Sequence, residues 1–291
     1  MPELPDVELY VESLAKVAAG QVLRAVHLRS PFVLRSVTPP LDALKGRTLQ
    51  KVSRLGKRIV LEFADDLFLV IHLMIAGRLR WREKPPLPPA KLTLAILEFE
   101  SGRLFFTEAS STKRASLQLL QGREALAALD PGGLEPLAIS LEHFRAVLTR
   151  ERHTLKRALT DPHLLSGIGN AYSDEILHAA RLSPLKLTSA MTDEEWARLH
   201  AATQATLRLW IDRLRAETGG VFPEKVTAFR EGMAVHGRFN QPCPVCGAPV
   251  QRIVYTDNEC NYCANCQNGG RRLADRAMSR LLKDAWPRTV G

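Results

Sequence analysis

The chain has 291 residues, a length that at roughly 100–200 residues per domain predicts about two domains. Forty Lys and Arg residues against 31 Asp and Glu residues give a net charge of +9, so the surface field favours polyanions such as nucleic acids. The longest apolar stretch, residues 67–76, contains His72 and is far shorter than the roughly 20 residues of a bilayer span, which excludes a membrane helix. The acidic first residues are unlike a secretory signal, so we expect a cytoplasmic protein with reduced thiols.

The first half of the chain predicts one helix followed by strands. Val7, Val11, Leu14 and Ala18 recur at helical spacing behind Pro5, which predicts a helix over residues 7–18. Short runs rich in apolar and β-branched residues then predict strands at 22–29, 58–63, 67–74, 91–100 and 103–108. This half is therefore predicted to be a sandwich of antiparallel sheets.

The second half changes to a helical period. Helices are predicted at residues 141–150, 154–161, 170–181 and 192–216, and a last one at 271–286. Thr192 and Glu195 form a capping box at the start of the longest of these helices. Its apolar face is expected to consist of Trp196, Leu199, Thr203, Leu207 and Trp210. The second domain is therefore predicted to be mostly α-helical.

All five cysteines lie between residues 243 and 266. Cys243 and Cys246 form one C-x2-C pair, Cys263 and Cys266 form a second, and the sixteen residues between the pairs match the spacing of a four-thiolate zinc site. A competing register that uses Cys260 would leave only thirteen residues between the pairs, outside that range. The alternative to a metal site is five unliganded core cysteines. A site with four protein ligands has no open position, so we expect the metal to be structural.

The segment between the helices at 154–161 and 170–181 contains Gly167 and Gly169. Glycines let a backbone approach a partner closely, and the amides at the start of the following helix point where an anion would bind. This turn would suit a DNA phosphate, and Lys156 adds positive charge one helix earlier. The alternative is an ordinary inter-helix loop beside a solvated lysine.

Pro2 and Glu3 form a candidate catalytic pair at the start of the chain. We expect Met1 to be removed before the small Pro2, which leaves a secondary amine. An α-amine has a pKa of about 7.7–8.0, so an appreciable fraction is unprotonated at neutral pH. Such an amine can attack a carbonyl-like sugar carbon and form an iminium, and Glu3 could move the proton. The alternative is a Met-Pro start without any catalytic role.

Taken together, these motifs resemble the formamidopyrimidine-DNA glycosylase and endonuclease VIII family of base excision repair enzymes. The resemblance covers nearly the whole chain, in order: Pro2-Glu3-Leu4-Pro5-x-Val7-Glu8, Gly56-Lys57, His72-Leu73 to Gly77, Lys156, Gly167-Ile168-Gly169-Asn170-x-Tyr172-x-x-Glu175, Val235-x-Gly237-Arg238 and the four-cysteine ribbon ending Cys266-Gln267.

The resemblance implies an α+β multidomain protein with DNA between its two main domains. The expected parts are an N-terminal helix and antiparallel β-sandwich (1–125), a helix-two-turn-helix domain (131–230), a zinc-finger β-hairpin (235–270) and a C-terminal helical extension (271–291). It implies that Pro2 is the Schiff-base nucleophile, that Glu3 is the acid and base, and that Lys57 completes the catalytic set. Expected DNA contacts are His72, Met74, Ile75, Lys113, Arg114, Lys156, Gly167, Gly169, Asn170, Arg238 and Asn258.

Three departures from the family pattern bear on specificity. The loop whose Arg and Phe read the opposite base is replaced by residues 108–116, Glu-Ala-Ser-Ser-Thr-Lys-Arg-Ala-Ser. The zinc-finger arginine, five residues before the third cysteine ligand, falls on Asn258. The predicted helix at 271–286 extends beyond the usual end of the relatives.

The sequence therefore predicts a bifunctional DNA glycosylase and abasic-site lyase for oxidised or ring-opened bases. We expect a monomer with one structural zinc ion and no organic cofactor, acting on damaged duplex, on abasic sites and on single-stranded or bubble DNA. One alternative is a non-catalytic protein that binds damaged DNA on the same scaffold. A weaker alternative is a zinc-ribbon partner of the transcription or translation machinery.

Overall fold

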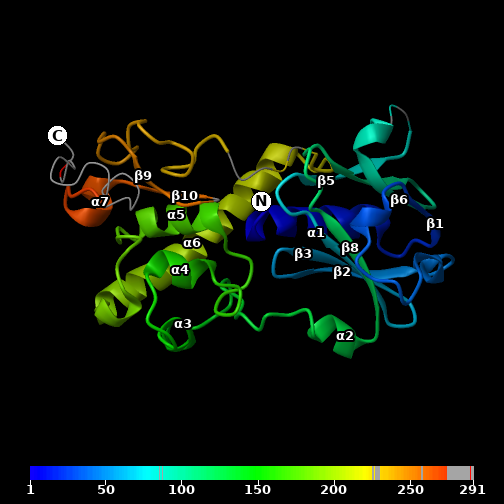
Figure 1. Cartoon of the computed structure of the whole chain (residues 1–291), viewed down its shortest axis with the longest axis horizontal. Helices are drawn as coiled ribbons and strands as arrows, with labels where there is room; N and C mark the ends of the chain where they lie inside the picture. Colours follow the sequence, from blue (N-terminus) through cyan, green and yellow to red (C-terminus); the bar gives the residue numbers. More distant parts are fainter. Residues whose placement is uncertain are drawn as a thin grey trace. The chain divides into compact units, whose positions relative to one another are not determined.

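The computed structural model describes residues 1–84, 86, 88–224, 226, 230–256, 258–273 and 289. The chain divides into two units: unit 1 comprises residues 1–131 and 210–228, and unit 2 comprises residues 132–209 and 229–291 (Figure 1). No helix in the described part of the chain is long and apolar enough to cross a membrane.

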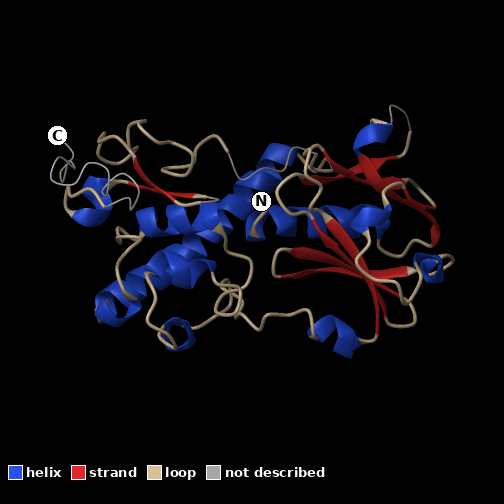
Figure 2. Ribbon diagram, in the orientation of Figure 1, coloured by secondary structure: helices blue, strands red, loops and turns tan. Residues whose placement is uncertain are grey.

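Unit 1 is a sandwich of two four-stranded antiparallel sheets with one long helix, as predicted (Figure 2). One sheet has the order β1 (Leu23–Leu28), β6 (Thr93–Phe99), β7 (Arg103–Glu108) and β5 (Gly77–Arg82). The other has the order β2 (Leu49–Leu55), β3 (Arg58–Phe63), β4 (Leu67–His72) and β8 (Ser116–Gln121). Helix α1 (Leu4–Ala18) packs against β2 and β3, and short helices lie at α2 (Arg123–Ala127), η1 (Pro31–Val33), η2 (Leu41–Leu44) and η3 (Ala90–Leu92).

The apolar face of α1 and the inner faces of both sheets form one core. Val7, Leu14 and Ala18 are buried there, and Val11 packs at its edge. Tyr10 is also completely buried, and its hydroxyl accepts a hydrogen bond from the backbone N–H of Leu79 (3.3 Å). This bond attaches the start of β5 to the helix that carries the N-terminus.

The sequence analysis did not predict β2, β5, β8 or α2. In β5 the sequence Gly-Arg-Leu-Arg-Trp-Arg alternates with a period of two, and Leu79 and Trp81 are buried while the arginines point the other way. In β2 and β8 polar residues interrupt the apolar pattern. Their pairing with β3 and β4 makes them strands, so the tertiary contacts outweigh the weak local signal.

Unit 2 contains the predicted helices and a small hairpin. The elements are α3 (Leu141–Leu148), α4 (Leu155–Thr160), α5 (Asn170–Ala179), η4 (Thr188–Ala190), α6 (Asp193–Thr218), β9 (Gln251–Val254), β10 (Glu259–Tyr262) and α7 (Ala264–Asn268). The residues of α6 up to 209 belong to unit 2, and those from 210 belong to unit 1. The predicted helix at 271–286 lies almost entirely outside the described residues.

The capping box of α6 is confirmed. The backbone N–H of Thr192 donates to Glu195 Oε2 (2.9 Å), and the backbone N–H of Glu195 donates to Thr192 Oγ1 (3.3 Å). The predicted apolar face is confirmed as well: Trp196, Leu199, Thr203, Leu207 and Trp210 are all buried.

Candidate functional site

The N-terminus lies against the first turn of α1. The backbone N–H of Glu3 donates to Asp6 Oδ2 (2.9 Å), which fixes the chain where the helix begins. Pro2 is buried, and so are Glu3 and Asp6. Burial lowers the pKa of the Met1 amine, the N-terminus of the full chain, below its ordinary value. The carboxylates of Glu3 and Asp6 oppose this shift, and the positive charges of Arg78 and Lys57 add to it. An amine in this environment loses its proton more readily than an exposed one.

Lys57 lies in the two-residue turn between β2 and β3. Leu55 pairs with Arg58 across this turn, and Gly56 has a φ of +60°, a conformation that glycine adopts without strain. Arg54 fixes the turn to α1, because its Nε donates to Glu8 Oε1 (2.6 Å) and its guanidinium also donates to the carbonyl of Gly56 (2.9 Å). The lysine is thereby held near the N-terminal amine.

His72 ends β4, where it pairs with Arg58 on one side and Ser116 on the other. Burial, together with the positive charges of Arg58 and Lys57, lowers the pKa of His72 to about 4. The imidazole is therefore neutral at physiological pH, and it would contact a phosphate as a hydrogen-bond donor rather than as a cation.

A tight turn, residues 73–77, connects β4 to β5. The backbone N–H of Gly77 donates to the carbonyl of Leu73 (2.8 Å). Met74 has a φ of +50°, an uncommon value for a residue with a side chain. Ile75 stands at the tip with 60% of its surface exposed. Of the two predicted apolar contacts to DNA, Ile75 is the more exposed one.

Residues 109–115 lie within the segment 108–116 that is expected to replace the family's reader loop, and they fold around Glu108. This carboxylate is 1% exposed, and both of its oxygens accept from the backbone N–H groups of Arg114 and Ala115 at 3.1–3.4 Å. The ammonium of Lys113 donates to the backbone carbonyl of Glu108, so it is turned onto its own loop. Arg114 is exposed.

In unit 2, the Gly-Ile-Gly turn leads directly into α5. Gly167 has a φ of +81°, and Gly169 is the residue before the first turn of the helix. Asn170 is the first residue of α5, and its side-chain amide donates to the carbonyl of Glu259 in β10 (2.7 Å). This bond attaches the turn to the hairpin of β9 and β10.

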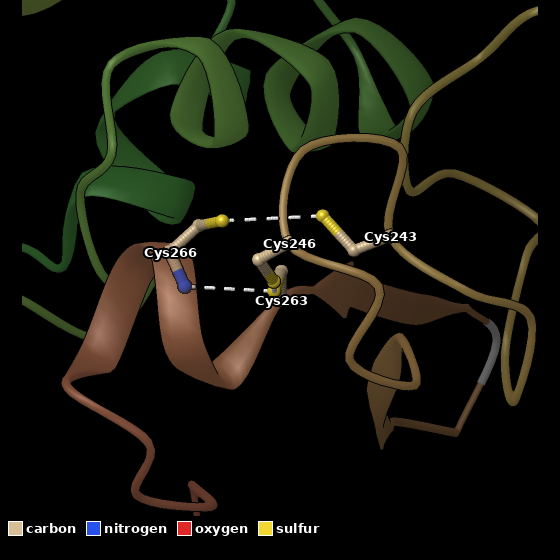
Figure 3. Close-up of side chains that lie close together, drawn as sticks. All are labelled: Cys243, Cys246, Cys263 and Cys266. Atoms are coloured by element: carbon tan, nitrogen blue, oxygen red, sulfur yellow. Dashed lines mark hydrogen bonds between the residues drawn. The ribbon is translucent and has the colours of Figure 1, made fainter.

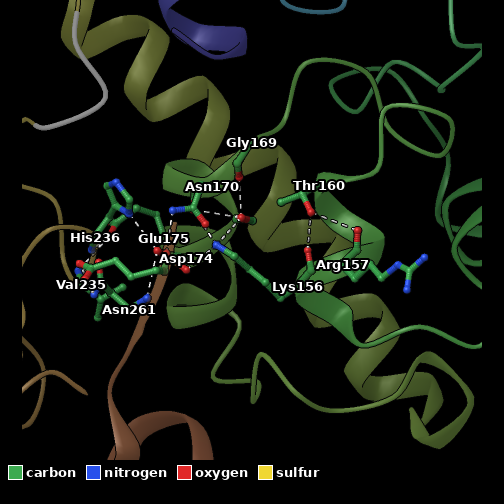
Figure 4. A network of polar contacts seen from close by, with 12 residues as sticks. Lys156, Arg157, Thr160, Gly169, Asn170, Asp174, Glu175, Val235, His236 and Asn261 are labelled. Atoms are coloured by element: carbon green, nitrogen blue, oxygen red, sulfur yellow. Dashed lines mark hydrogen bonds and ion pairs between the residues drawn. The ribbon is translucent and has the colours of Figure 1, made fainter. Parts of the chain in front are cut away.

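Lys156 is almost completely buried, with 8% of its surface exposed. Its ammonium donates to the carbonyl of Asn170 (2.7 Å), to Ser173 Oγ (2.8 Å) and to Asp174 Oδ1 (2.5 Å) (Figure 4). An ammonium has three donors, and all three are used inside the unit. Lys156 thus binds the N-terminal turn of α5 through hydrogen bonds inside the unit, and its direct contact with a phosphate stays a prediction.

Two consecutive buried carboxylates attach α5 to the segments that follow α6. Asp174 Oδ2 accepts from His236 Nδ1 (2.8 Å) and from the backbone N–H of Asn261 (3.2 Å). Glu175 accepts from the backbone N–H groups of Ala234, Val235 and His236 at 2.7–2.9 Å (Figure 4). Burial raises the pKa of Glu175 even though these three bonds favour its charged form.

The four predicted cysteine ligands lie together. The sulfur atoms of Cys243, Cys246, Cys263 and Cys266 are within 4.8 Å of one another (Figure 3). Cys260 is not part of the group: it is buried on β10, and burial next to the Asp174 carboxylate raises the pKa of its thiol. Four sulfurs at these distances fit the ligand set of a tetrahedral thiolate site.

The two remaining predicted DNA contacts lie near the hairpin. The guanidinium of Arg238 donates to the carbonyls of Met233 (3.0 Å) and Pro242 (3.1 Å), so it supports its own loop. Asn258 is exposed between β9 and β10, and its carbonyl accepts from the backbone N–H of Tyr255 (2.8 Å).

Each unit thus brings together part of the predicted site. Unit 1 holds Pro2, Glu3 and Lys57 around the N-terminus, and unit 2 holds the glycine turn, Lys156 and Asn170 beside the cysteine group. The sequence analysis missed Arg78, Asp174 and the function of Glu108 within its loop. The alternation in β5 could have indicated Arg78, but the two carboxylates carry no local signal.

Family models match both halves of the chain. The formamidopyrimidine-DNA glycosylase N-terminal domain matches residues 1–114, and the H2TH domain of the same enzyme matches residues 133–219. Formamidopyrimidine-DNA glycosylases of Desulforamulus reducens and Heliobacterium modesticaldum are 35% and 34% identical, over 92% of this chain and 99–100% of theirs.

Solved structures agree with the family models. A Lactococcus lactis Fpg complex with DNA containing an abasic site has a TM-score of 0.79 at 26% identity and covers 91% of this chain and 99% of its own. A second complex of that enzyme, with DNA containing FAPY-dG, has a TM-score of 0.81 at 26% identity and covers 91% and 100%.

Proposed function

Because this chain belongs to the formamidopyrimidine-DNA glycosylase family, whose members act in base excision repair, we propose that it excises oxidised or ring-opened bases and then cleaves the strand at the resulting abasic site. The single observation that supports the lyase step most strongly is the environment of the terminal amine. Burial, Arg78 and Lys57 lower the pKa of the Met1 amine. Pro2, whose amine the removal of Met1 would free, is the next residue and is buried beside Glu3.

In the proposed reaction the amine of Pro2, freed by removal of Met1, attacks sugar carbon C1′. Glu3 takes up the proton that the attacking amine loses, the bond from C1′ to the base breaks, and the departing base takes up a proton from solvent. The sugar ring then opens, with Glu3 supplying the proton to the ring oxygen, and the secondary amine is left as an iminium. The iminium makes the C2′ proton acidic, so its removal expels the 3′ phosphate. Water then hydrolyses the iminium and releases Pro2.

Borohydride trapping tests this proposal. The native protein should give a covalent adduct with abasic DNA, and mass spectrometry should map the adduct to Pro2. A matched protein with an N-terminal extension, which converts the amine to an amide, should bind the same DNA without forming the adduct. Undiminished trapping by the extended protein would contradict the assignment. Binding without any adduct from the native protein would favour the non-catalytic alternative.

The proposed DNA contacts come from both units. We assign contact with the everted nucleotide and its phosphates to Lys57, His72, Gly167, Gly169 and Asn170, with Lys156 acting through the turn that it supports. Eversion is required because the glycosidic carbon cannot be reached inside the base stack. Damaged duplex, abasic sites and bubble DNA are the proposed substrates, and the proposed active form is a monomer in the bacterial cytosol.

We assign one structural zinc ion to Cys243, Cys246, Cys263 and Cys266. Zinc would hold the loop that carries the first two cysteines to the start of α7, and four thiolates leave no coordination position for substrate. The ion would therefore shape the hairpin and take no part in the reaction.

A further inference from the structure

Arg78, the second residue of β5, contacts the turn at residues 73–77. Its terminal nitrogen donates to the carbonyls of Ile75 (3.2 Å) and Gly77 (2.6 Å). We propose that Arg78 is a positioning residue for base eversion, because its guanidinium holds this turn in the conformation that presents Ile75 to the DNA. The proposal rests on the proposed function, since an apolar side chain at the tip is useful only when a nucleotide leaves the stack.

The turn requires such support because its conformation is strained. The left-handed backbone of Met74, with a φ of +50°, is unfavourable for a residue that is not glycine. The turn is also tight, since a Cβ atom on Gly77 would lie 2.3 Å from the carbonyl oxygen of Leu73. The two bonds from Arg78 add to the backbone bond from Gly77 N–H to the Leu73 carbonyl that closes the turn.

Arg78 can provide that support because its own backbone is fixed. It pairs with Thr107 of β7, and Thr107 Oγ1 donates to its carbonyl (3.3 Å). The next residue, Leu79, donates its N–H to the hydroxyl of buried Tyr10 in α1 (3.3 Å). The guanidinium therefore extends from a rigid strand to a strained turn, and it leaves the side chain of Ile75 exposed.

The chain offers a matched control on the same strand face. Arg80 lies two residues further along β5, within 3.8 Å of Glu224, and no hydrogen bond to the turn is found for it among the described residues. Arg78→Met removes the guanidinium and keeps an unbranched stem, and Arg80→Met makes the same change away from the turn. Arg78→Lys keeps the charge and restores a donor.

The test uses 2-aminopurine placed opposite a tetrahydrofuran abasic site in duplex DNA, a probe that brightens when it is unstacked. The wild-type protein should increase the fluorescence, and R78M should lose more than half of that increase, as should Ile75→Ala. R80M should retain it, and R78K should restore part of it. The double variant I75A/R78M should resemble I75A alone, because Arg78 acts through Ile75.

Excision provides the second readout. R78M should slow excision from duplex about tenfold and slow cleavage of single-stranded abasic DNA clearly less, because a single strand needs no wedge. R78K, which keeps the positive charge near the terminal amine, should leave the single-strand cleavage within twofold. Equal losses on both DNAs, or additive losses in the double variant, would overturn the inference in favour of a merely structural arginine. A wild-type protein that gives no fluorescence increase would also overturn it. A fluorescence increase without a borohydride adduct would contradict only the lyase step.

Discussion

His72 shows at the residue scale how a partly buried imidazole links stability to pH. The pKa of His72 is about 4 in the folded protein, and the ordinary histidine value of about 6.5 applies to the unfolded chain. Between these two pH values mainly the unfolded chain binds the proton. The contribution of His72 to the free energy of unfolding is fully present above pH 6.5, and it is lost as the pH falls towards 4. At about 1.4 kcal/mol per pH unit, the effect amounts to at most roughly 3 kcal/mol.

The variant His72→Gln should therefore weaken the pH dependence of unfolding. Between pH 7.5 and pH 5, the urea concentration at the midpoint of unfolding should fall more for the wild-type protein than for the variant. Identical changes in the two proteins would show that other groups, and not His72, determine the acid sensitivity.

Glu3 is the residue whose replacement should separate the two proposed chemical steps. Glu3→Gln should reduce base excision by roughly 10²–10⁴-fold, because the ring oxygen and the departing base need protons. It should reduce cleavage of preformed abasic sites less, since the open aldehyde already lacks a base. Glu12→Gln, an exposed change in the same helix, is the control. Equal losses on the two substrates would contradict this division of roles.

At the scale of elements, the regular patterns predicted most of the fold. The strands at 58–63 and 103–108 have the predicted bounds, and the four central helices differ from the prediction by a few residues at their ends. The strand β5 was missed because its arginines hid the alternation. Asp174 and Glu175 could not be assigned from the sequence, because their partners lie 59 to 87 residues further along the chain.

The spacing of the cysteines was sufficient to predict their grouping, and it also yields a test of the metal. The protein should bind one zinc ion per chain, and Cys246→Ser should release it and weaken DNA binding. Cys260→Ser is the matched control, since that thiol lies outside the group of four sulfurs and should not affect the metal content. Loss of zinc from Cys260→Ser but not from Cys266→Ser would contradict the assignment.

At the scale of the whole molecule, the loop at 109–115 determines what we expect of substrate choice. A loop that hydrogen-bonds the base opposite the everted nucleotide distinguishes one opposite base from another by about 1–3 kcal/mol per good bidentate contact, or roughly ten- to a hundredfold. Here the ammonium of Lys113 bonds its own loop, and no aromatic residue follows Lys113 in the segment. Ile75, which is exposed, is therefore the proposed apolar wedge. We therefore expect excision to depend only weakly on an opposite cytosine. We also expect comparatively high activity on abasic sites, ring-opened bases and single-stranded or bubble DNA, where eversion of the nucleotide costs least.

Excision of 8-oxoguanine and of oxidised pyrimidines opposite each of the four bases, in duplex and in bubble DNA, measures this preference. The rates opposite the four bases should differ by less than tenfold, and the bubble should be cut at least as well as the duplex. Strong 8-oxoguanine excision confined to pairs with cytosine in duplex would mean that another segment reads the opposite strand.

The adjacent carboxylates of α5 have a consequence for how unit 2 opens. Asp174 and Glu175 accept from four backbone amides, those of Ala234, Val235, His236 and Asn261. Separating these segments from α5 would remove the three backbone donors of Glu175 and would leave Asp174 with its ion pair to Lys156 on the α4 side, so partial opening is costly. In native-state hydrogen exchange these four amides should open together with the interior amides of α5, as one cooperative unit. Exchange of the four amides at much lower free energy than α5 would show that the hairpin opens independently of the helix.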